Sequence, residues 1–232
     1  MTCPSNYIRN RLAQETDAPP DQIHVIPWGA DDLDGGLIDA ETESCVLNKY
    51  RVTSPFVLHL GATQNHKNTR RLIEAWAYLR RRTRRQWRLL VLGLDATAQR
   101  DLLKNCQLEG VQSSVLLQGF ANGEETRILI SAAEVLAHPS LAEGFGGPVL
   151  EAFAAGTAVL TGNRTSLPEI AGDAALLVDP EDRLDMTRGL NRLIQQPNLR
   201  SSLAQRGSAQ LQHFPWHSSA EAFGRLFNSV IA

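Results

Sequence analysis

Short apolar runs alternate with amphipathic segments along most of the chain. The apolar runs predict strands at 56–60, 88–92, 115–118, 134–138, 158–161 and 174–178. Apolar residues at helical spacing predict helices between them, at about 68–82, 96–107, 123–132, 147–155 and 165–171. Continuous apolar strands separated by helices are typical of a parallel sheet covered on both faces. We therefore predict an α/β fold with a Rossmann-like, doubly wound parallel sheet.

The two ends of the chain depart from this alternation. Beyond the predicted sheet, the pattern indicates extra C-terminal helices at about 181–195, 197–212 and 217–231, the last two separated by Pro215. Before it, the pattern predicts a helix at 6–15, a turn at 17–21, a lone strand at 23–26 and a polar linker or irregular loop at 27–50. A helix and one strand cannot close a core, so this segment should pack on the main domain or belong to a further one.

Composition narrows the class of protein. The chain has 232 residues, of which 43% are hydrophobic and 21% charged, with a formal net charge of -2. These values are ordinary for a soluble globular protein, and they argue against a protein that coats nucleic acid. At about 150 residues per domain, the length corresponds to roughly one and a half domains. The three cysteines have no metal-ligand spacing and the N-terminus has no apolar signal segment, so we expect a cytoplasmic protein.

The most informative segment follows the predicted strand at 134–138 and reads H-P-S-L-A-E-G-F-G-G-P-V-L-E. Its glycines would let backbone amides approach a ligand, and the helix that begins near Pro148 would present free N–H groups to an anion. Glu143 and Glu151 flank this turn, and a carboxylate can accept two hydrogen bonds from a vicinal diol. The pattern favours a phosphate held between two sugars. The alternatives are a loop acid at Glu143 and helix-dipole stabilisation by Glu151.

The junction after the first predicted sheet strand carries a basic pair, His66-Lys67. The sequence there, G-A-T-Q-N-H-K-N, is not G-x-G-x-x-G, and no P-loop motif occurs in the chain. Ligands of open α/β sheets gather at the carboxyl ends of strands, so Lys67 could neutralise a phosphate there. A solvated loop lysine is the alternative reading.

These segments together resemble the family 4 glycosyltransferases of the GT-B fold. The run E-G-F-G-G-P-V-L-E from Glu143 to Glu151 is similar to the E-x7-E signature of that family's C-terminal, nucleotide-sugar-binding domain. The junction from Gly61 to Asn68 resembles G-x-x-x-P-R-K-N, and the run I-H-V-I-P-W-G-A-D at 23–31 resembles the segment that joins the family's two domains. H-F-P-W-H at 213–217 is similar to the motif before the last helix.

The resemblance implies a role for each matching residue. Glu151 would take the ribose hydroxyls of the donor, Glu143 the transferred sugar, and Lys67 the diphosphate, while Gly119-Phe120 would lie near the nucleobase. The implied catalytic residues are Lys67 and Glu143. The implied donor-binding set is Gly61, His66, Lys67, Gly119, Phe120, Glu143, Gly144, Phe145, Gly146, Gly147, Val149 and Glu151. His66 stands where the family has an arginine, so one diphosphate charge is missing.

The resemblance also implies an activity and a domain plan. The expected activity is retaining transfer of a hexose from a nucleotide-diphosphate sugar, GDP-mannose or a UDP-hexose, to a glycan or lipid-linked acceptor, without metal or cofactor. Residues 1–54 would be the end of an acceptor domain plus a linker, 55–212 the donor-binding domain, and 213–232 a crossover helix. Three alternatives stay open: a non-catalytic subunit that needs a partner chain with an acceptor domain, a truncated inactive product, and a sugar-nucleotide hydrolase or epimerase.

Weaker signals compete with this interpretation. Asp32-Leu-Asp34 matches the metal-binding D-x-D of another glycosyltransferase fold, but it lies in the polar linker, and we expect no metal there. The basic run at 80–88, R-R-R-T-R-R-Q-W-R, permits a peripheral contact with an acidic membrane, although solvated helix-end cations are the better explanation. His24, His59, His138, His213 and His217 have no serine or cysteine in a triad-like context, which gives a hydrolase no support.

Overall fold

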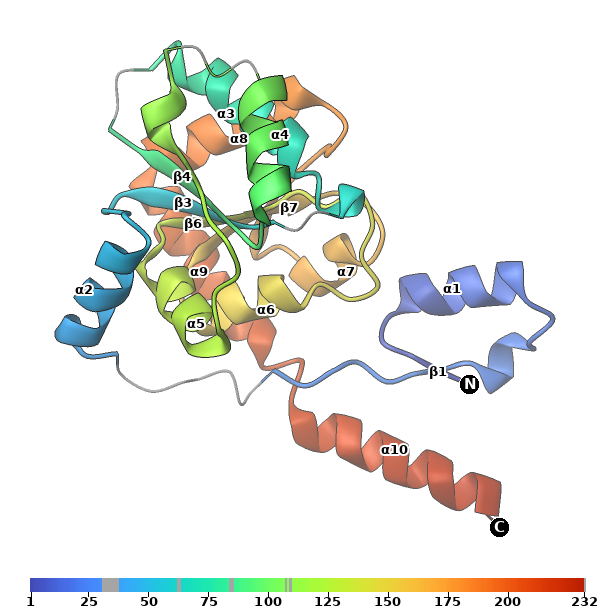
Figure 1. Ribbon diagram of the computed structural model, residues 1–232. Coiled ribbons are helices and arrows are strands. Elements are labelled where there is room, and N and C mark those ends of the chain that lie inside the picture. The colour runs from blue at the N-terminus through green and yellow to red at the C-terminus, as the bar shows by residue number, and fades with distance from the viewer. Residues whose placement is uncertain (31–37, 62–63, 84–85, 107, 109, 232) are drawn as a thin grey trace.

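A parallel sheet of six strands forms the centre of the protein (Figure 1). The structure, a computed structural model, describes residues 1–30, 38–61, 64–83, 86–106, 108 and 110–231. The strands are β3 (Phe56–Leu60), β4 (Arg88–Leu92), β5 (Val115–Leu117), β6 (Val135–His138), β7 (Ala158–Gly162) and β8 (Ala175–Val178). They lie in the order β5-β4-β3-β6-β7-β8, and each neighbouring pair is parallel. The predicted doubly wound α/β fold is confirmed.

Alternation along the strands produces two apolar layers. Phe56 and Leu58 are buried on the face that α5 (Gly123–Ala132) and α6 (Gly147–Ala154) cover. Val57 is buried on the opposite face, with α3 (Thr69–Arg80), α8 (Arg183–Gln195) and the β4 residues Leu89 and Val91 (Figure 1). Both faces of the sheet are therefore covered, which is why most positions along the strands are apolar instead of alternating with polar ones.

The strand order fixes where a ligand can bind. Counted from β3, it is the order 3-2-1-4-5-6, so the chain reverses direction across the sheet between β3 and β6. These two strands pair through Val57 and Val135. The helices that follow them, α3 and α6, cover opposite faces of the sheet, and in open α/β sheets such a switch point leaves a ligand-binding crevice at the carboxyl ends of the strands.

Apart from α2 (Ala40–Lys49), the α-helices agree with the sequence predictions to within a few residues. The others not yet given are α1 (Asn6–Glu15), α4 (Ala96–Asn105), α7 (Leu167–Ala171), α9 (Pro197–Leu211) and α10 (Trp216–Ile231), with single turns at η1 (Pro20–Gln22) and η4 (Gln112–Ser114). α1 and α10 project from the body of the protein (Figure 1). None of the helices in the described ranges combines the length and apolar character that a membrane span needs.

The prediction of a lone strand at 23–26 is wrong. β2 (His24–Val25) pairs in parallel with β1 (Thr2–Cys3) at the start of the chain. Carbonyls of Met1 and Cys3 accept hydrogen bonds from the amides of His24 and Ile26, both at 2.9 Å. β1 has only two residues, too few for an alternating pattern to reveal it in the sequence.

The prediction of an irregular loop at 27–50 is wrong for its second half, which forms α2 (Ala40–Lys49). The Asp39 carboxylate accepts a hydrogen bond from the Thr42 amide at 2.9 Å and caps the helix. Tyr50, at the helix end, is buried, and its hydroxyl donates to Glu125 of α5 at 2.8 Å. Val46 is the helix's one buried residue, so the apolar stripe that normally identifies a helix is almost missing here.

The N-terminal segment packs on the main body near the glycine-rich turn. The Ser5 hydroxyl donates to the Gly144 carbonyl at 2.8 Å, and the amides of Asn6 and Tyr7 donate to the Glu169 carboxylate at 2.9 and 3.2 Å. The Ala30 amide donates to the Phe214 carbonyl at 2.7 Å. The N-terminal segment is thus held by hydrogen bonds both to the main body and to the segment that precedes α10.

Candidate functional site

The loops that follow β3 and β6 meet at the switch point and are tied together there. The first forms the single turn η3 (Asn65–Lys67) and ends at Asn68, whose φ is 61°. The buried Asn68 side chain donates to the Pro139 carbonyl at 3.0 Å and to the Pro180 carbonyl at 2.7 Å. The Leu141 amide donates to the His66 carbonyl at 2.7 Å. These bonds fix the basic pair beside the loop that carries Glu143.

Lys67 and Glu143 lie together in this crevice, as the resemblance implies. Lys67 Nζ is 2.8 Å from Glu143 Oε1, and the two side chains are 19% and 13% exposed. His138, the last residue of β6, places Nε2 2.9 Å from the same oxygen. Sequence reasoning did not assign His138 to the site, and its position five residues before Glu143 was the only available signal.

The electrostatics of the cluster keep Glu143 ionised. Burial raises the pKa of Glu143, but the hydrogen bonds from His138 and Lys67, together with the positive charge of Lys67, outweigh burial and lower that pKa to about 2. Burial lowers the pKa of the His138 imidazole, although the nearby Glu143 carboxylate opposes this shift. At neutral pH the cluster therefore holds a carboxylate with a neutral imidazole and the ammonium of Lys67 beside it.

The backbone of the glycine-rich turn is held by two hydroxyls from the loop after β7. The buried Ser166 hydroxyl lies 2.9 Å from the Glu143 carbonyl and 3.0 Å from the Phe145 carbonyl. Thr165 adopts a φ of 59°, and its hydroxyl accepts a hydrogen bond from the Glu143 amide at 3.1 Å. A left-handed threonine costs free energy that the surrounding structure must supply, and such positions cluster at functional sites.

Gly146 occupies a backbone conformation that disfavours other residues. Its φ is 111°, and a Cβ placed there would lie 3.1 Å from Leu167 Cδ2. We expect Gly146→Ala to lower the free energy of unfolding by about 1–3 kcal/mol in urea denaturation. The matched control is Gly123→Ala, where an added Cβ meets nothing within 4 Å. Equal effects of the two substitutions would contradict this view of the turn.

Glu151 lies one helical turn into α6, after the glycine-rich turn. A Cβ added to Gly147 would be 3.9 Å from Glu151 Oε1, so the carboxylate folds back beside the first helical turn. Burial raises the pKa of Glu151, and the charge of Lys67 partly offsets that shift. Within the described ranges, its carboxylate has no hydrogen-bond partner. It is therefore free to accept hydrogen bonds from a ligand.

Glycines also end the neighbouring strands of the sheet, as predicted for Gly61 and Gly119. The Gly93 amide donates to the Gly119 carbonyl at 2.9 Å, and a Cβ on Gly93 would lie 2.5 Å from the Gly61 carbonyl oxygen. The Phe120 side chain is 78% exposed. Gly61 and Gly119 thus lie at one edge of the sheet, with an uncovered aromatic ring beside them.

Two residues of the implied donor set turn their side chains into the core. The Phe145 ring packs 5.3 Å from Trp28 and 5.9 Å from Phe214, centroid to centroid. Val149 is fully buried, and its amide donates to the Gly146 carbonyl at 2.9 Å. Their contribution to the site is to hold the turn, since neither side chain faces the crevice.

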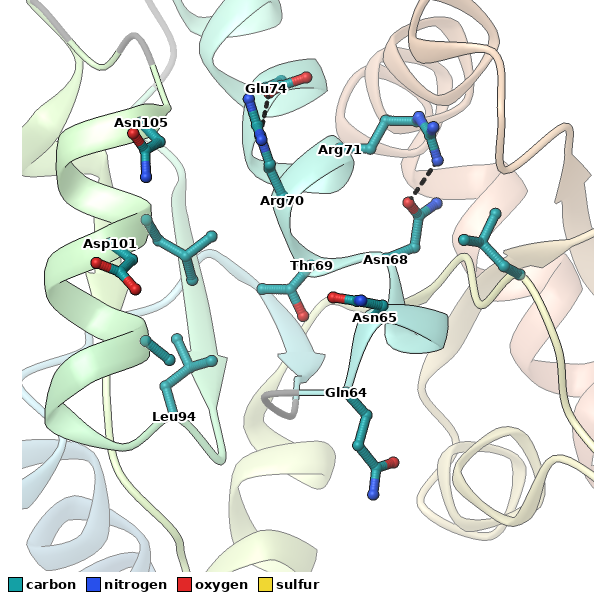
Figure 2. Close-up of a pocket in the computed structure, with 13 residues that line it drawn as sticks. Gln64, Asn65, Asn68, Thr69, Arg70, Arg71, Glu74, Leu94, Asp101 and Asn105 are labelled. Atoms are coloured by element: carbon teal, nitrogen blue, oxygen red, sulfur yellow. Dashed lines mark hydrogen bonds and ion pairs between the residues drawn. The ribbon is translucent and has the colours of Figure 1, made fainter.

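A cavity of about 580 Å³ adjoins the crevice, between α3 and α4 (Figure 2). Gln64, Asn65 and Leu141 line it, whereas Lys67, Glu143 and Glu151 do not. Both of its arginines have partners in the cavity wall: Arg70 pairs with Glu74 at 3.0 Å, and Arg71 donates to Asn68 at 2.8 Å (Figure 2). The cavity and the implied donor site therefore share only the η3 turn and its neighbourhood.

The proximity of a serine and a histidine does not create a hydrolase triad. Ser140 Oγ is 3.3 Å from His138 Nε2, the same nitrogen that contacts Glu143. A triad needs the serine and the acid on opposite ring nitrogens, and His138 Nδ1 has no partner within the described structure. Ser140 is also fully buried. The arrangement positions a carboxylate and does not activate a nucleophile.

The remaining sequence signals lie elsewhere. Asp32 and Asp34 fall outside the described residues. In the basic run, Trp87 is buried, with the Arg200 guanidinium 5.2 Å from its ring centroid. Arg82 stacks on the Tyr78 ring at 3.6 Å. Trp87 is therefore a core residue rather than an exposed anchor.

Known proteins resemble the chain in sequence and fold. It is 33% identical over 218 residues to O-antigen chain mannosyltransferase B of Escherichia coli, a match that covers 92% of this chain and 56% of that protein. It is 30% identical to the MMP alpha-(1->4)-mannosyltransferase of Mycolicibacterium hassiacum, with 92% and 50% covered. The chain thus spans about half the length of these curated relatives.

A solved structure of similar fold is Anabaena Alr3699/HepE in complex with UDP-glucose. It has a TM-score of 0.84 and 19% identity, over 98% of this chain and 63% of that one. The similarity in fold agrees with one half of a GT-B enzyme. Residues 47–210 match the family described as glycosyl transferases group 1. This match takes in the crevice and most of the sheet, and the chain belongs to that glycosyltransferase family.

Proposed function

We propose that the chain is the donor-binding part of a retaining hexosyltransferase that uses a nucleotide-diphosphate sugar. The observation that carries this proposal is the grouping of Lys67, Glu143 and Glu151 at the switch-point crevice. One cation and two carboxylates there match a diphosphate between a ribose and a hexose. The mannosyltransferases among its relatives favour a mannosyl donor such as GDP-mannose, with a UDP-hexose as the alternative.

Each group would have a distinct task. Lys67 would bind the diphosphate and stabilise the charge that develops on the leaving group, assisted by the backbone amide of Gly147 at the start of α6. Glu143 would accept a hydroxyl of the transferred sugar, and Glu151 the ribose diol. The exposed ring of Phe120 would lie near the base. His66, Gly61, Gly119 and the backbone at 144–147 would complete the contacts.

The acceptor site would lie mainly outside this chain. We propose that 55–212 form the donor domain, that 1–54 and 213–232 connect it to an acceptor-binding domain, and that the acceptor is a glycan or lipid-linked sugar in polysaccharide synthesis. That domain would be part of the same polypeptide or a partner chain. Catalysis would take place on the cytoplasmic side, without metal or nucleic acid.

Calorimetric titration with GDP-mannose, GDP, UDP-glucose and UDP tests the proposal. We expect saturable binding either of GDP-mannose and GDP or of UDP-glucose and UDP, according to which base the site accepts. We expect little sugar transfer by these 232 residues alone. Absence of binding to all four ligands would contradict the donor role. Robust transfer to an acceptor by the chain alone would contradict the proposed division of the active site.

We further expect His66→Arg to tighten binding of the diphosphate donor by about three- to tenfold, because a guanidinium adds a charged, bidentate phosphate contact. Calorimetry on wild type and variant measures the change. His217→Arg, an equal change of charge at an exposed position of α10, should leave affinity unaltered. Equal or weaker donor binding by the His66 variant would contradict the argument from missing charge.

A further inference from the structure

The unusual feature of the crevice is that two protein groups approach a single oxygen of Glu143. Lys67 Nζ and His138 Nε2 are 2.8 and 2.9 Å from Oε1. No hydrogen bond to Oε2 is found within the described residues. The two oxygens of one carboxylate are therefore unequal: one is occupied by protein, and the other is free to accept from a ligand.

The surroundings of His138 decide which ring nitrogen carries its proton. The residue is fully buried, and Nδ1 has no partner in the part of the chain that the structure describes. In the Nδ1–H tautomer, the N–H at Nδ1 would be a buried donor without an acceptor. The unprotonated Nε2 would then place its lone pair 2.9 Å from a carboxylate oxygen, where two acceptors repel each other. Both effects are unfavourable. The Nε2–H tautomer is the one that satisfies this geometry, and it donates to Glu143.

A charged imidazolium is disfavoured for the same reason, since it would add an unsatisfied N–H at Nδ1. His138 is therefore a neutral donor, and Lys67 supplies the positive charge beside Glu143. A lysine can donate three hydrogen bonds, so Lys67 can keep its contact with Glu143 and still reach a phosphate. The imidazole, packed inside β6, has no such freedom.

We propose that His138 is a positioning residue, which holds Oε1 of Glu143 so that Oε2 alone accepts a hydroxyl of the donor sugar. This inference rests on the proposed donor function. Without His138, the carboxylate could rotate about its last bond and both oxygens would compete for Lys67. The hydroxyl contact would weaken, whereas contacts to the nucleotide, made by Glu151 and Lys67, would persist.

The first test needs no ligand and no variant. In ¹⁵N NMR of the wild-type chain, His138 should give the shifts of the neutral Nε2–H tautomer throughout pH 5–8. An Nδ1–H tautomer or an imidazolium would overturn the proposal. This result is independent of whether any nucleotide sugar binds, so it separates failure of the positioning role from failure of the proposed function.

The second test compares sugar and nucleotide affinities by calorimetry, with GDP-mannose against GDP and UDP-glucose against UDP. We expect His138→Leu to weaken the nucleotide sugar about tenfold, with the nucleotide diphosphate changed less than about twofold. His138→Gln, whose amide can donate from a similar place, should restore most of the loss. His59→Leu removes the other fully buried sheet histidine and controls for packing.

In this second test, three outcomes would overturn the proposal. One is equal weakening of sugar and nucleotide in His138→Leu, and another is failure of His138→Gln to recover. The third is that His59→Leu lowers the affinity for the nucleotide sugar, relative to that for the nucleotide diphosphate, by as much as His138→Leu does. Binding of none of the four ligands by wild type would instead contradict the donor function, and the ¹⁵N measurement would still decide the role of His138.

Discussion

Replacement of Glu151 by alanine should nearly abolish nucleotide binding. Its half-buried carboxylate has no hydrogen-bond partner in the described structure and lies beside the first turn of α6. Two charge-assisted hydrogen bonds to a ribose diol, at roughly 1.5–3 kcal/mol each, correspond to a loss of at least about 100-fold in affinity. Titration of the variant with GDP and UDP measures this loss.

The control must separate ribose binding from helix-dipole stabilisation. Glu124 is an exposed acid in the first turn of α5, so Glu124→Ala removes a comparable dipole interaction of about 0.3–1 kcal/mol away from the crevice. It should leave nucleotide affinity unchanged. The ribose role would be contradicted if Glu151→Ala kept wild-type nucleotide affinity and lost only as much stability as Glu124→Ala. Glu151 would then only stabilise the helix dipole.

Replacement of Lys67 by methionine should remove most of the affinity that the second phosphate contributes. Lys67 Nζ is the cation that the structure places against Glu143 in the crevice, and it is largely buried. A charged contact in such an environment is worth about 2–3 kcal/mol, so GDP or UDP should bind roughly 30- to 100-fold more weakly. GMP or UMP should lose less. The ratio of diphosphate to monophosphate affinity is therefore the quantity to measure.

Lys49→Met provides the matched control, because Lys49 also pairs with a glutamate, Glu125, but on the surface between α2 and α5. It should leave both affinities unchanged. If Lys67→Met lowered the affinities for the monophosphate and the diphosphate equally, Lys67 would maintain the structure of the site without contacting the second phosphate.

The same substitution should change acid stability. With its pKa lowered to about 2, Glu143 contributes stability that is fully present above its ordinary pKa and is lost progressively as the pH falls from there through about 2. Removal of Lys67 removes one cause of the low pKa, so the contribution of Glu143 should be smaller in the variant and its loss should be complete at a higher pH. Urea unfolding of wild type and Lys67→Met between pH 2 and 7 would show it. Parallel pH profiles would contradict the ion pair.

Much of the fold followed from the sequence because the sheet strands are buried on both faces. Short apolar runs such as 56–60 and 88–92 are typical of strands in a parallel sheet that is covered on both faces. The structure has β3 and β4 at these positions. α2 was missed since it buries one residue, Val46. β1 was missed because its pairing with β2 depends on a contact between residues more than twenty positions apart.

The sequence predicts the site residues that belong to a recognisable motif. It does not predict those whose role arises only from the packing of the folded chain. Lys67 and Glu143 are both assigned to the donor site by resemblance to a motif, and their side chains lie 2.8 Å apart. The roles of His138 and Ser166 depend on burial and on carbonyls brought close by the fold, which no spacing rule contains. Val149 matched a motif position, yet its side chain belongs to the core.

A crystal structure of the chain soaked with GDP-mannose or UDP-glucose tests the central claim most directly. The account predicts a nucleotide whose ribose contacts Glu151, whose diphosphate contacts Lys67, and whose hexose contacts Glu143 through Oε2. A nucleotide bound in the cavity between α3 and α4, with Lys67 still paired only to Glu143, would contradict it.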